Sequence, residues 1–330
     1  MRRLWPWLRV LLGVGIVVAL AVRLGTGAVV GGLRAIGPGS VLAALAIGLL
    51  TTVFSAWRWC LVARGLGLRL PLATAVADCY RALLLNSVLP AGVLGDVHRA
   101  VSHGRQAGDV GRGVRAVVLE RLAGQVVLMV VGVGVLAAHP TLLAAAVDGL
   151  TSGRGITNGT LAVLAVVLAT VLAGVVAIGA AAVRGGRASR LRDAVRAGLA
   201  DVRAGVLSLG TWPAVVLLSA AALAGYLALF VVAARAAGSQ ATLGELLPLL
   251  VLALFAMGLP LNVGGWGPRE AVSTAAFGAV GFGATQGLST AVVYGVLSLI
   301  ACLPGVGVLL LRRPISRCPA PPPAARVAGC

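Results

Sequence analysis

The chain has 330 residues, of which 59% are hydrophobic and only 11% are charged, and its mean hydropathy is +1.03. Soluble domains carry about 25% charged residues, so this composition excludes an ordinary soluble protein and indicates a polytopic membrane protein. The net charge is +18, and every basic residue is arginine. Because these arginines lie between apolar runs, we interpret them as signals of membrane orientation and expect no nucleic acid as a partner.

Six apolar runs reach the length of about 20 residues that a membrane-spanning helix needs. They cover residues 7–30, 41–62, 116–138, 160–183, 212–234 and 287–311. The first run follows Arg2 and Arg3, as the apolar core of a signal peptide would. No clean small-residue cleavage site follows before Arg23, so we predict that this run is a retained span.

Two further apolar runs are shorter, and each ends at a Leu-Pro break that leads through a glycine-rich stretch into charged residues. One break falls in each half of the chain. This pairing is typical of transporters that are built from two repeats and bind their substrate where membrane helices are interrupted. The residues of the two breaks are Pro90, Gly92, Gly95, Pro260, Gly264, Gly265 and Gly267.

The distribution of arginines predicts how these short runs sit in the membrane. If both are re-entrant hairpins, over 72–96 and 246–285, most of the 27 arginines fall on the cytoplasmic side. If both crossed fully, two arginine-rich loops would be external, against the positive-inside rule. We therefore predict an all-α polytopic membrane protein with six full spans, two re-entrant helical hairpins and both termini in the cytoplasm.

This assignment gives each half the same order of two spans, one re-entrant segment and one span. The first half, 1–155, begins inside and the second, 156–311, begins outside, so we predict an inverted-topology repeat with a cavity between the halves. The loop 184–206 has the spacing of an amphipathic interfacial helix, with a solvated linker as the alternative. The proline-rich segment 312–330 is predicted to be a disordered cytoplasmic tail.

The five cysteines and three histidines form no metal-binding pattern. The cysteine count is odd and no Cys-x-x-Cys pair occurs, so we predict no disulfide framework, no zinc site and no cofactor. His98 and His103 are five residues apart, whereas a helix-borne metal pair needs a spacing of four. We interpret them as solvated loop residues.

Charged residues inside membrane segments mark functional candidates, because each costs about 2.5 to 3.5 kcal/mol on insertion scales. Each arginine near a break has a carboxylate close by in the sequence. The resulting pairs are Asp78 with Arg81, Asp96 with Arg99, Glu120 with Arg121, and Arg269 with Glu270. The first pair is three residues apart and therefore shares one helical face.

Two interpretations fit these pairs. In the first, arginines face a shared cavity and bind a lipid phosphate, because a guanidinium makes two parallel hydrogen bonds to one phosphate. The residues of this hypothetical site are Arg81, Arg121, Arg269, Asn86 and Asn262. The carboxylates that would balance its charge or carry protons for coupling are Asp78, Asp96, Glu120 and Glu270. In the second interpretation, the two charges of each pair only neutralise each other and hold the hairpin in place.

Three motifs in order carry a resemblance to a known family. They are Asn-Ser-Val-Leu-Pro-Ala-Gly-Val-Leu-Gly-Asp-Val-His-Arg at 86–99, Leu-Glu-Arg-Leu-Ala-Gly at 119–124, and Pro-x-x-x-Gly-Gly-x-Gly-x-Arg-Glu at 260–270. Over nearly the whole chain the sequence resembles the lysylphosphatidylglycerol synthase transmembrane region family of flippase-like proteins. One departure is Leu94, which replaces the first glycine of the more usual Gly-Gly-Asp. The resemblance implies a protein of the bacterial cytoplasmic membrane that moves lipids, such as aminoacylated phosphatidylglycerol or lipid-linked sugars.

We therefore predict a lipid flippase or transporter whose partners are membrane lipids with anionic or phosphate-bearing head groups. The sequence shows no nucleophile-and-base arrangement and no Asp-x-Asp pair, so we do not expect an enzyme. In the resembled family, aminoacyl transfer belongs to a soluble domain, which we do not expect here because the chain ends soon after its last predicted span. The alternative is a membrane partner or scaffold of a separately encoded lipid-modifying transferase.

Overall fold

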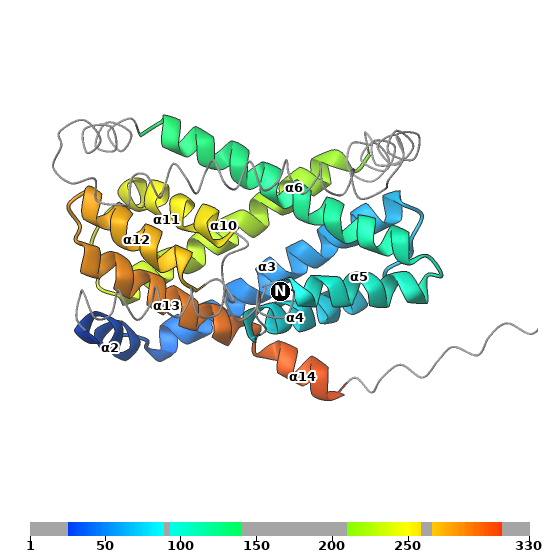
Figure 1. Ribbon diagram of the computed structural model, residues 1–330, viewed down its shortest axis with the longest axis horizontal. Coiled ribbons are helices and arrows are strands. Elements are labelled where there is room, and N and C mark those ends of the chain that lie inside the picture. Colours follow the sequence, from blue (N-terminus) through cyan, green and yellow to red (C-terminus); the bar gives the residue numbers. More distant parts are fainter. Residues whose placement is uncertain (1–25, 89–92, 140–209, 259–265, 312–330) are drawn as a thin grey trace, which may run out of the picture.

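The computed structural model describes residues 26–88, 93–139, 210–258 and 266–311, and these ranges are helical apart from short connections (Figure 1). Several predictions fall outside the described residues. They concern the span 160–183, most of the span 7–30, the loop 184–206, the tail 312–330, the hypothetical site residue Asn262 and the break residues Pro90, Gly92, Pro260, Gly264 and Gly265.

Four segments of the described residues are long and apolar enough to cross a membrane. They are α3 (Pro38–Gly65), α6 (Val110–Ala137), α10 (Trp212–Ala236) and the segment formed by α13 (Ala284–Cys302) and α14 (Pro304–Leu311). These segments confirm long apolar helices, which are candidate spans, at the predicted positions 41–62, 116–138, 212–234 and 287–311. They run lengthwise through the molecule in Figure 1.

Two helix boundaries differ from the sequence prediction for local reasons. α6 begins at Val110, six residues before the predicted start, because the Asp109 side chain accepts a hydrogen bond from the Arg112 N–H at 2.9 Å and caps the helix. The last predicted span is divided at Leu303, immediately before Pro304. A proline inside a helix removes one backbone donor and clashes with the preceding turn, which explains the division.

A pair of packed helices lies at each predicted re-entrant segment. In the first half, α4 (Leu72–Val88) packs on α5 (Leu94–Gln106), although α5 extends well beyond the predicted end at 96, and in the second half α11 (Leu243–Met257) packs on α12 (Pro268–Ala279). Each half therefore has the order long helix, helix pair, long helix. Figure 1 shows the α4–α5 pair toward one end of the long axis and the α11–α12 pair toward the other.

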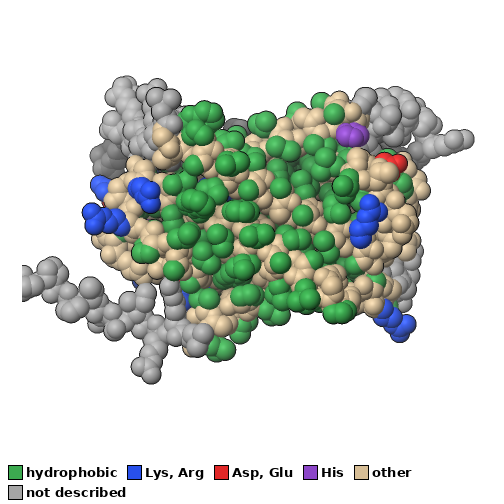
Figure 2. Space-filling view, turned by 180° about the vertical axis from the view of Figure 1, so that it is seen from behind, with side chains coloured by type: hydrophobic (Ala, Val, Ile, Leu, Met, Phe, Trp, Pro, Cys, Tyr) green, Lys and Arg blue, Asp and Glu red, His purple; other side chains and the backbone are tan. Residues whose placement is uncertain are grey.

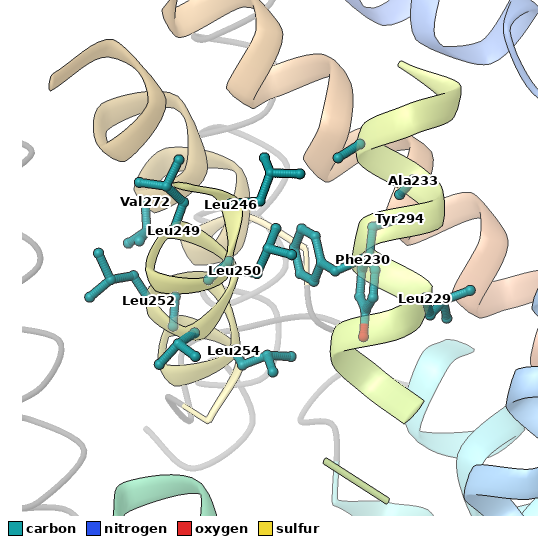
Figure 3. Close-up of a cluster of buried hydrophobic side chains, with 14 of the residues drawn as sticks. Leu229, Phe230, Ala233, Leu246, Leu249, Leu250, Leu252, Leu254, Val272 and Tyr294 are labelled. Atoms are coloured by element: carbon teal, nitrogen blue, oxygen red, sulfur yellow. The ribbon is translucent and has the colours of Figure 1, made fainter. Parts of the chain in front are cut away.

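The central contacts join the two halves. α3 packs along α10, α13 packs on both of them, and α2 (Thr26–Arg34) lies against α13. The larger core lies in the second half, where leucines of α11 face Phe230 of α10 beside Tyr294 of α13 (Figure 3). A second core around the buried Trp59 joins α3 to α4, α5 and α6. In lipid, such contacts hold helices together mainly through van der Waals packing.

The surface is apolar over its middle. In Figure 2, hydrophobic side chains cover the centre of the face, and charged side chains lie at the two ends of the long axis. Large side chains at the surface include Val126 and Val130 of α6 and Leu217 of α10, each at least 60% exposed. An apolar band of this extent indicates a surface that faces lipid.

Candidate functional site

Five charged side chains from three helices form one hydrogen-bonded group, which we name the charge network. Its members are Arg58 on α3, Asp96 and Arg99 on α5, and Glu120 and Arg121 on α6. The side chains of Arg58, Arg99 and Glu120 are at most 7% exposed, whereas that of Arg121 is 46% exposed. The network contains three guanidinium groups and two carboxylates, so its net charge is +1.

Glu120 lies at the centre of the charge network. Its Oε1 accepts hydrogen bonds from both Nε and Nη2 of Arg58, the first at 3.1 Å, and its Oε2 accepts from Arg99 Nη2 at 2.6 Å. Arg58 Nη1 also donates to the Ser219 hydroxyl of α10 at 3.0 Å. One carboxylate thus joins α3, α5 and α6, and through Arg58 it reaches α10. Charge-assisted bonds of this kind offset the cost of burying the ions.

Asp96 connects the same network to the first hairpin. Its Oδ1 accepts from Arg99 Nε at 2.9 Å and from Arg121 Nη2 at 2.8 Å, and its Oδ2 accepts from Asn86 Nδ2 at 3.1 Å. The Asn86 Oδ1 in turn accepts from the Gly95 N–H at 2.8 Å, so Asn86 on α4 holds the start of α5. Burial alone would raise the pKa of Asp96, but the charges of Arg121 and Arg99 outweigh it and lower this pKa below its ordinary value.

A small cavity of about 20 Å³ lies beside the charge network. Its lining includes Thr52, Ser55, Cys79, Ala82, Leu83, Arg99, Glu120, Arg121 and Tyr226. A volume of this size has room for about one water molecule. Glu120 follows the start of α6 by ten residues, which places it about 15 Å along a helix that rises 1.5 Å per residue. The network therefore lies well inside the length of the spanning helices.

Four residues of the second half form a separate group, which we name the Arg269 cluster. Arg269 is 1% exposed, bonds Glu270 through Nε at 3.0 Å and through Nη2, and lies 5.0 Å from the Trp266 ring and 5.2 Å from the Tyr294 ring. Glu270 Oε2 also accepts from the Gly267 N–H at 2.6 Å. Gly267 has a φ of 102°, a left-handed conformation that favours glycine.

The family model described as "Lysylphosphatidylglycerol synthase TM region" matches residues 7–305 and so includes both groups. The chain belongs to this family. Comparisons with curated proteins and with solved structures find no match. The lysylphosphatidylglycerol synthase TM region is a membrane domain and not the catalytic part of a synthase. Together with the apolar helices, membership identifies a multi-pass membrane protein with a lipid-related function.

Within this lysylphosphatidylglycerol synthase TM region, three of the four predicted pairs are confirmed. Arg81 Nη1 lies 3.6 Å from Asp78 Oδ1, and Asp96 pairs with Arg99 as Arg269 does with Glu270. The predicted pair of Glu120 with Arg121 is wrong. Glu120 bonds Arg58 and Arg99, and Arg121 bonds Asp96. Adjacent residues can pair, as Arg269 and Glu270 do, but here α3 and α5 bring other partners to Glu120 and Arg121.

The structure brings only part of the hypothetical phosphate site to the cavity. Arg121 lines it, and Asn86 reaches it indirectly by bonding Asp96. Arg81 and Arg269 are not among the residues that line it, and Asn262 lies outside the described residues. Gly95 lies against the backbone of Ala82, where a side chain would have no room, so this glycine of the family's first motif allows α4 and α5 to approach closely.

Sequence reasoning missed three buried residues of this region. The sequence does not single out Arg58 and predicts Arg99 only as the partner of Asp96, whereas both are buried in the charge network, with exposures of 6% and 2%. His98 and His103 lie in α5 and not in the predicted loop; His98 is exposed as predicted, but His103 is only 4% exposed. The sequence held one usable signal, since Arg58 falls within the predicted span 41–62, where a charge needs a partner.

Proposed function

We propose that this protein moves a lipid with an anionic, phosphate-bearing head group across the bacterial cytoplasmic membrane, and that Arg121 binds this head group. The observation that carries the proposal is a buried network of net charge +1 whose half-exposed member faces a cavity between membrane helices. A net positive charge at this depth is costly unless an anion offsets it. The lipid tails remain in the bilayer while the head group crosses beside the protein.

The geometry of Arg121 supports a direct contact with phosphate. A guanidinium has five N–H donors, and among the described residues only one donor of Arg121 bonds a protein group, Asp96 Oδ1. A phosphate oxygen competes with Asp96 for this cation, while Asp96 keeps its bonds from Arg99 and Asn86. The cavity has room for about one water molecule, which is too little for a phosphate. Binding therefore requires α4 and α5 to move against α6 and α10.

We extend the proposal to the topology of six spans, two re-entrant hairpins and an inverted repeat with both termini in the cytoplasm. The shared helix order of the two halves supports it, as do the helix pairs at opposite ends of the long axis. Five exposed arginines gather near the connections of α3 to α4 and of α5 to α6, and two lie at the opposite ends of the long helices. The first set is Arg64, Arg69, Arg105, Arg112 and Arg115, and the second is Arg34 and Arg235. The positive-inside rule places the first set in the cytoplasm.

Transport by purified protein in vesicles tests the role of Arg121. The vesicles contain phosphatidylcholine with a fluorescent phosphatidylglycerol analogue in one leaflet, and the measurement is the rate at which the analogue reaches the other leaflet. We expect Arg121→Gln to lower this rate at least about tenfold, because it removes the bidentate cation. The control is Arg112→Gln on the same helix, which removes an exposed arginine paired with Asp109 on the surface and is expected to leave the rate within about twofold. Equal rates for both variants would contradict the proposal.

A second candidate function is that of a membrane partner for a separately encoded lipid-modifying transferase. The observation that favours it is the family itself, which is the membrane region of a synthase. The partner function predicts that the unaltered protein moves no phosphatidylglycerol in vesicles. It also predicts that deleting this protein from cells abolishes transferase activity and that expressing the Arg121→Gln variant restores it. Both results together would replace transport by the partner function.

A further inference from the structure

His103 on α5 is a buried, titratable side chain that the charge network does not include. Its side chain is 4% exposed, and its Nε2 is buried without a hydrogen-bond partner among the described residues. Its ring meets the Trp59 ring of α3 edge-on, with 5.6 Å between centroids and 76° between planes. Trp59 is itself fully buried, and its Nε1 likewise has no hydrogen-bond partner in this part of the chain. An unpartnered imidazole nitrogen at such a site is a vacant acceptor for a proton.

The Trp59 ring connects His103 to the charge network. The Arg99 guanidinium carbon lies 4.7 Å from the centre of this ring, at the distance of a cation–π contact. Arg99 precedes His103 by four residues, so both side chains project from one face of α5 toward Trp59. Arg99 also bonds Glu120 and Asp96. A change of charge on His103 therefore acts on the charge network through the Trp59 ring, which both His103 and Arg99 contact.

The charged and titratable groups around this contact come from all the helices packed there. Asp78 of α4 acts electrostatically on His103, and Cys79 of α4 accepts a hydrogen bond from Arg99 at 3.5 Å. The remaining charges reach His103 through Arg99 and are Asp96 of α5, Glu120 of α6 and, behind Glu120, Arg58 of α3.

Two opposing effects act on the pKa of His103. Burial lowers the pKa of His103, and the carboxylate of Asp78 opposes this effect. The pKa of Asp96 is held below its ordinary value by Arg121 and Arg99 against the effect of burial, so Asp96 stays ionised at pH 5. At this contact, His103 is therefore the group of α5 whose charge changes as the pH falls below the ordinary histidine range.

We propose that His103 is a proton-binding site coupled to the anion site through Trp59 and Arg99, so that binding of an anionic head group is accompanied by uptake of one proton. The ligand is a proton delivered by hydronium: one O–H bond of hydronium breaks, an N–H bond forms at the imidazole nitrogen that carries no hydrogen, and a water molecule is released. In the absence of an anion, a second cation beside Arg99 adds to the net positive charge and competes for the Trp59 ring. An anion at Arg121 offsets that charge, so proton and anion strengthen each other's binding by the same factor. This inference rests on the proposed function for the identity of the anion.

The pH dependence of transport is the first test. Vesicles of phosphatidylcholine and phosphatidylglycerol in a 4:1 ratio are compared between pH 8 and pH 5, with the same fluorescent phosphatidylglycerol analogue. We expect the rate of the unaltered protein to rise about fivefold toward pH 5, a typical size for coupling between two sites. The rate of His103→Gln should be independent of pH. The control His98→Gln, an exposed histidine of the same helix, should keep the full rise. Because the negative surface potential of the vesicles is common to all three proteins, it cannot produce this difference.

A direct titration keeps the inference testable if His103→Gln fails to fold or if the protein moves no lipid. The chain has three histidines, so NMR of isotope-labelled histidine in lipid nanodiscs can follow each one, with His98→Gln and His139→Gln for assignment. We expect His103 to titrate below the ordinary histidine value in phosphatidylcholine, and its pKa to rise more than that of His98 when phosphatidylglycerol is added. Absence of titration between pH 4 and pH 8, or an equal rise for both histidines, would overturn the proton site. A rise confined to His103 without lipid movement would support the proton site and refute transport.

Discussion

Corresponding helices of the two halves meet at two junctions that are filled in opposite ways. α3, α5 and α6 meet at the charge network, whereas α12 and α13 meet at the Arg269 cluster, where the Phe230 ring of α10 stacks on Tyr294. Arg58 and Phe230 lie in the last third of α3 and α10, and Glu120 and Tyr294 each follow the start of their helix by ten residues. The first junction joins its long helices by an ion pair, while the second joins them by a ring stack with 3.9 Å between centroids.

The two junctions differ in net charge and in exposure, which indicates that they have different roles. The Arg269 cluster contains one arginine and one carboxylate, is enclosed by aromatic rings and is almost fully buried, so it is electrically neutral and closed. The charge network has one cation more than it has carboxylates and exposes that cation at a cavity. We infer that the second junction stabilises the fold and that the first binds and moves the ligand. Tyr226 of α10 lines the cavity and lies within electrostatic range of both Arg121 and Tyr294, so it stands between the two junctions.

The largest expected effect comes from removing the central carboxylate. Glu120→Gln leaves Arg58 and Arg99 as buried cations that have lost their shared partner, and breaking a buried ion pair on one side costs about 3 to 5 kcal/mol. We expect a strong loss of thermal stability in detergent and no measurable transport. Asp109→Asn, which changes an exposed carboxylate on the surface of the same helix, serves as the control. A Glu120→Gln protein with unchanged stability would show that the network does not hold the three helices together.

At the second junction both charges can be removed together, because Arg269 and Glu270 pair with each other. In the double variant Arg269→Met and Glu270→Leu, both charges are replaced together by apolar side chains of similar volume, a change that is often neutral when no ion is left unpaired. The cost that remains is the lost bond to the Gly267 N–H, about 1 kcal/mol. We expect folded protein that transports at a rate within about threefold of the unaltered chain. Abolished transport in a stable double variant would move the binding role to the Arg269 cluster.

Each junction has one glycine packed against its arginine, so adding a single methyl group at each allows the two junctions to be compared. Gly295 faces the Arg269 guanidinium and the Trp266 ring, and Gly124 faces the Arg58 guanidinium, with Nη1 3.0 Å from the position of an added Cβ. Gly295→Ala overpacks a closed group, so we expect about 1 to 3 kcal/mol of destabilisation and unchanged transport per folded molecule. Gly124→Ala leaves room after a small shift of the Arg58 guanidinium, so we expect a smaller loss of stability and slower transport, because the shift weakens the bonds from Arg58 to Glu120. Thermal unfolding and vesicle transport on the same samples distinguish the two outcomes.

The sequence predicts the spans far better than it predicts the contacts between them. Hydropathy locates α3, α6, α10 and the α13–α14 segment because lipid requires apolar length in any fold. Pairs of charges one helical turn or less apart are also partly predictable, as Asp78 with Arg81 shows. The partners of Glu120 and Arg121 are not, because they depend on how α3 and α5 rotate against α6, and helices brought together by packing leave no local signal for that rotation.

The smallest expected effect concerns the pH dependence of stability. Burial lowers the pKa of His103 in the folded protein, while in the unfolded chain it is about 6.5. The unfolded state therefore binds this proton more readily, so the stability from a neutral His103 is complete above about pH 6.5 and is lost as the pH falls below it. The loss is at most about 1.4 kcal/mol for each pH unit below 6.5. We expect the melting temperature in a zwitterionic detergent to fall between pH 7 and pH 5, and His103→Gln to show a smaller fall than His98→Gln.

Added phosphatidylglycerol should reduce the fall in the unaltered protein and not in Arg121→Gln, because an anion at the first junction makes the proton on His103 less costly. No such lipid effect is expected for a ligand held at the Arg269 cluster, so the same titration distinguishes the two junctions.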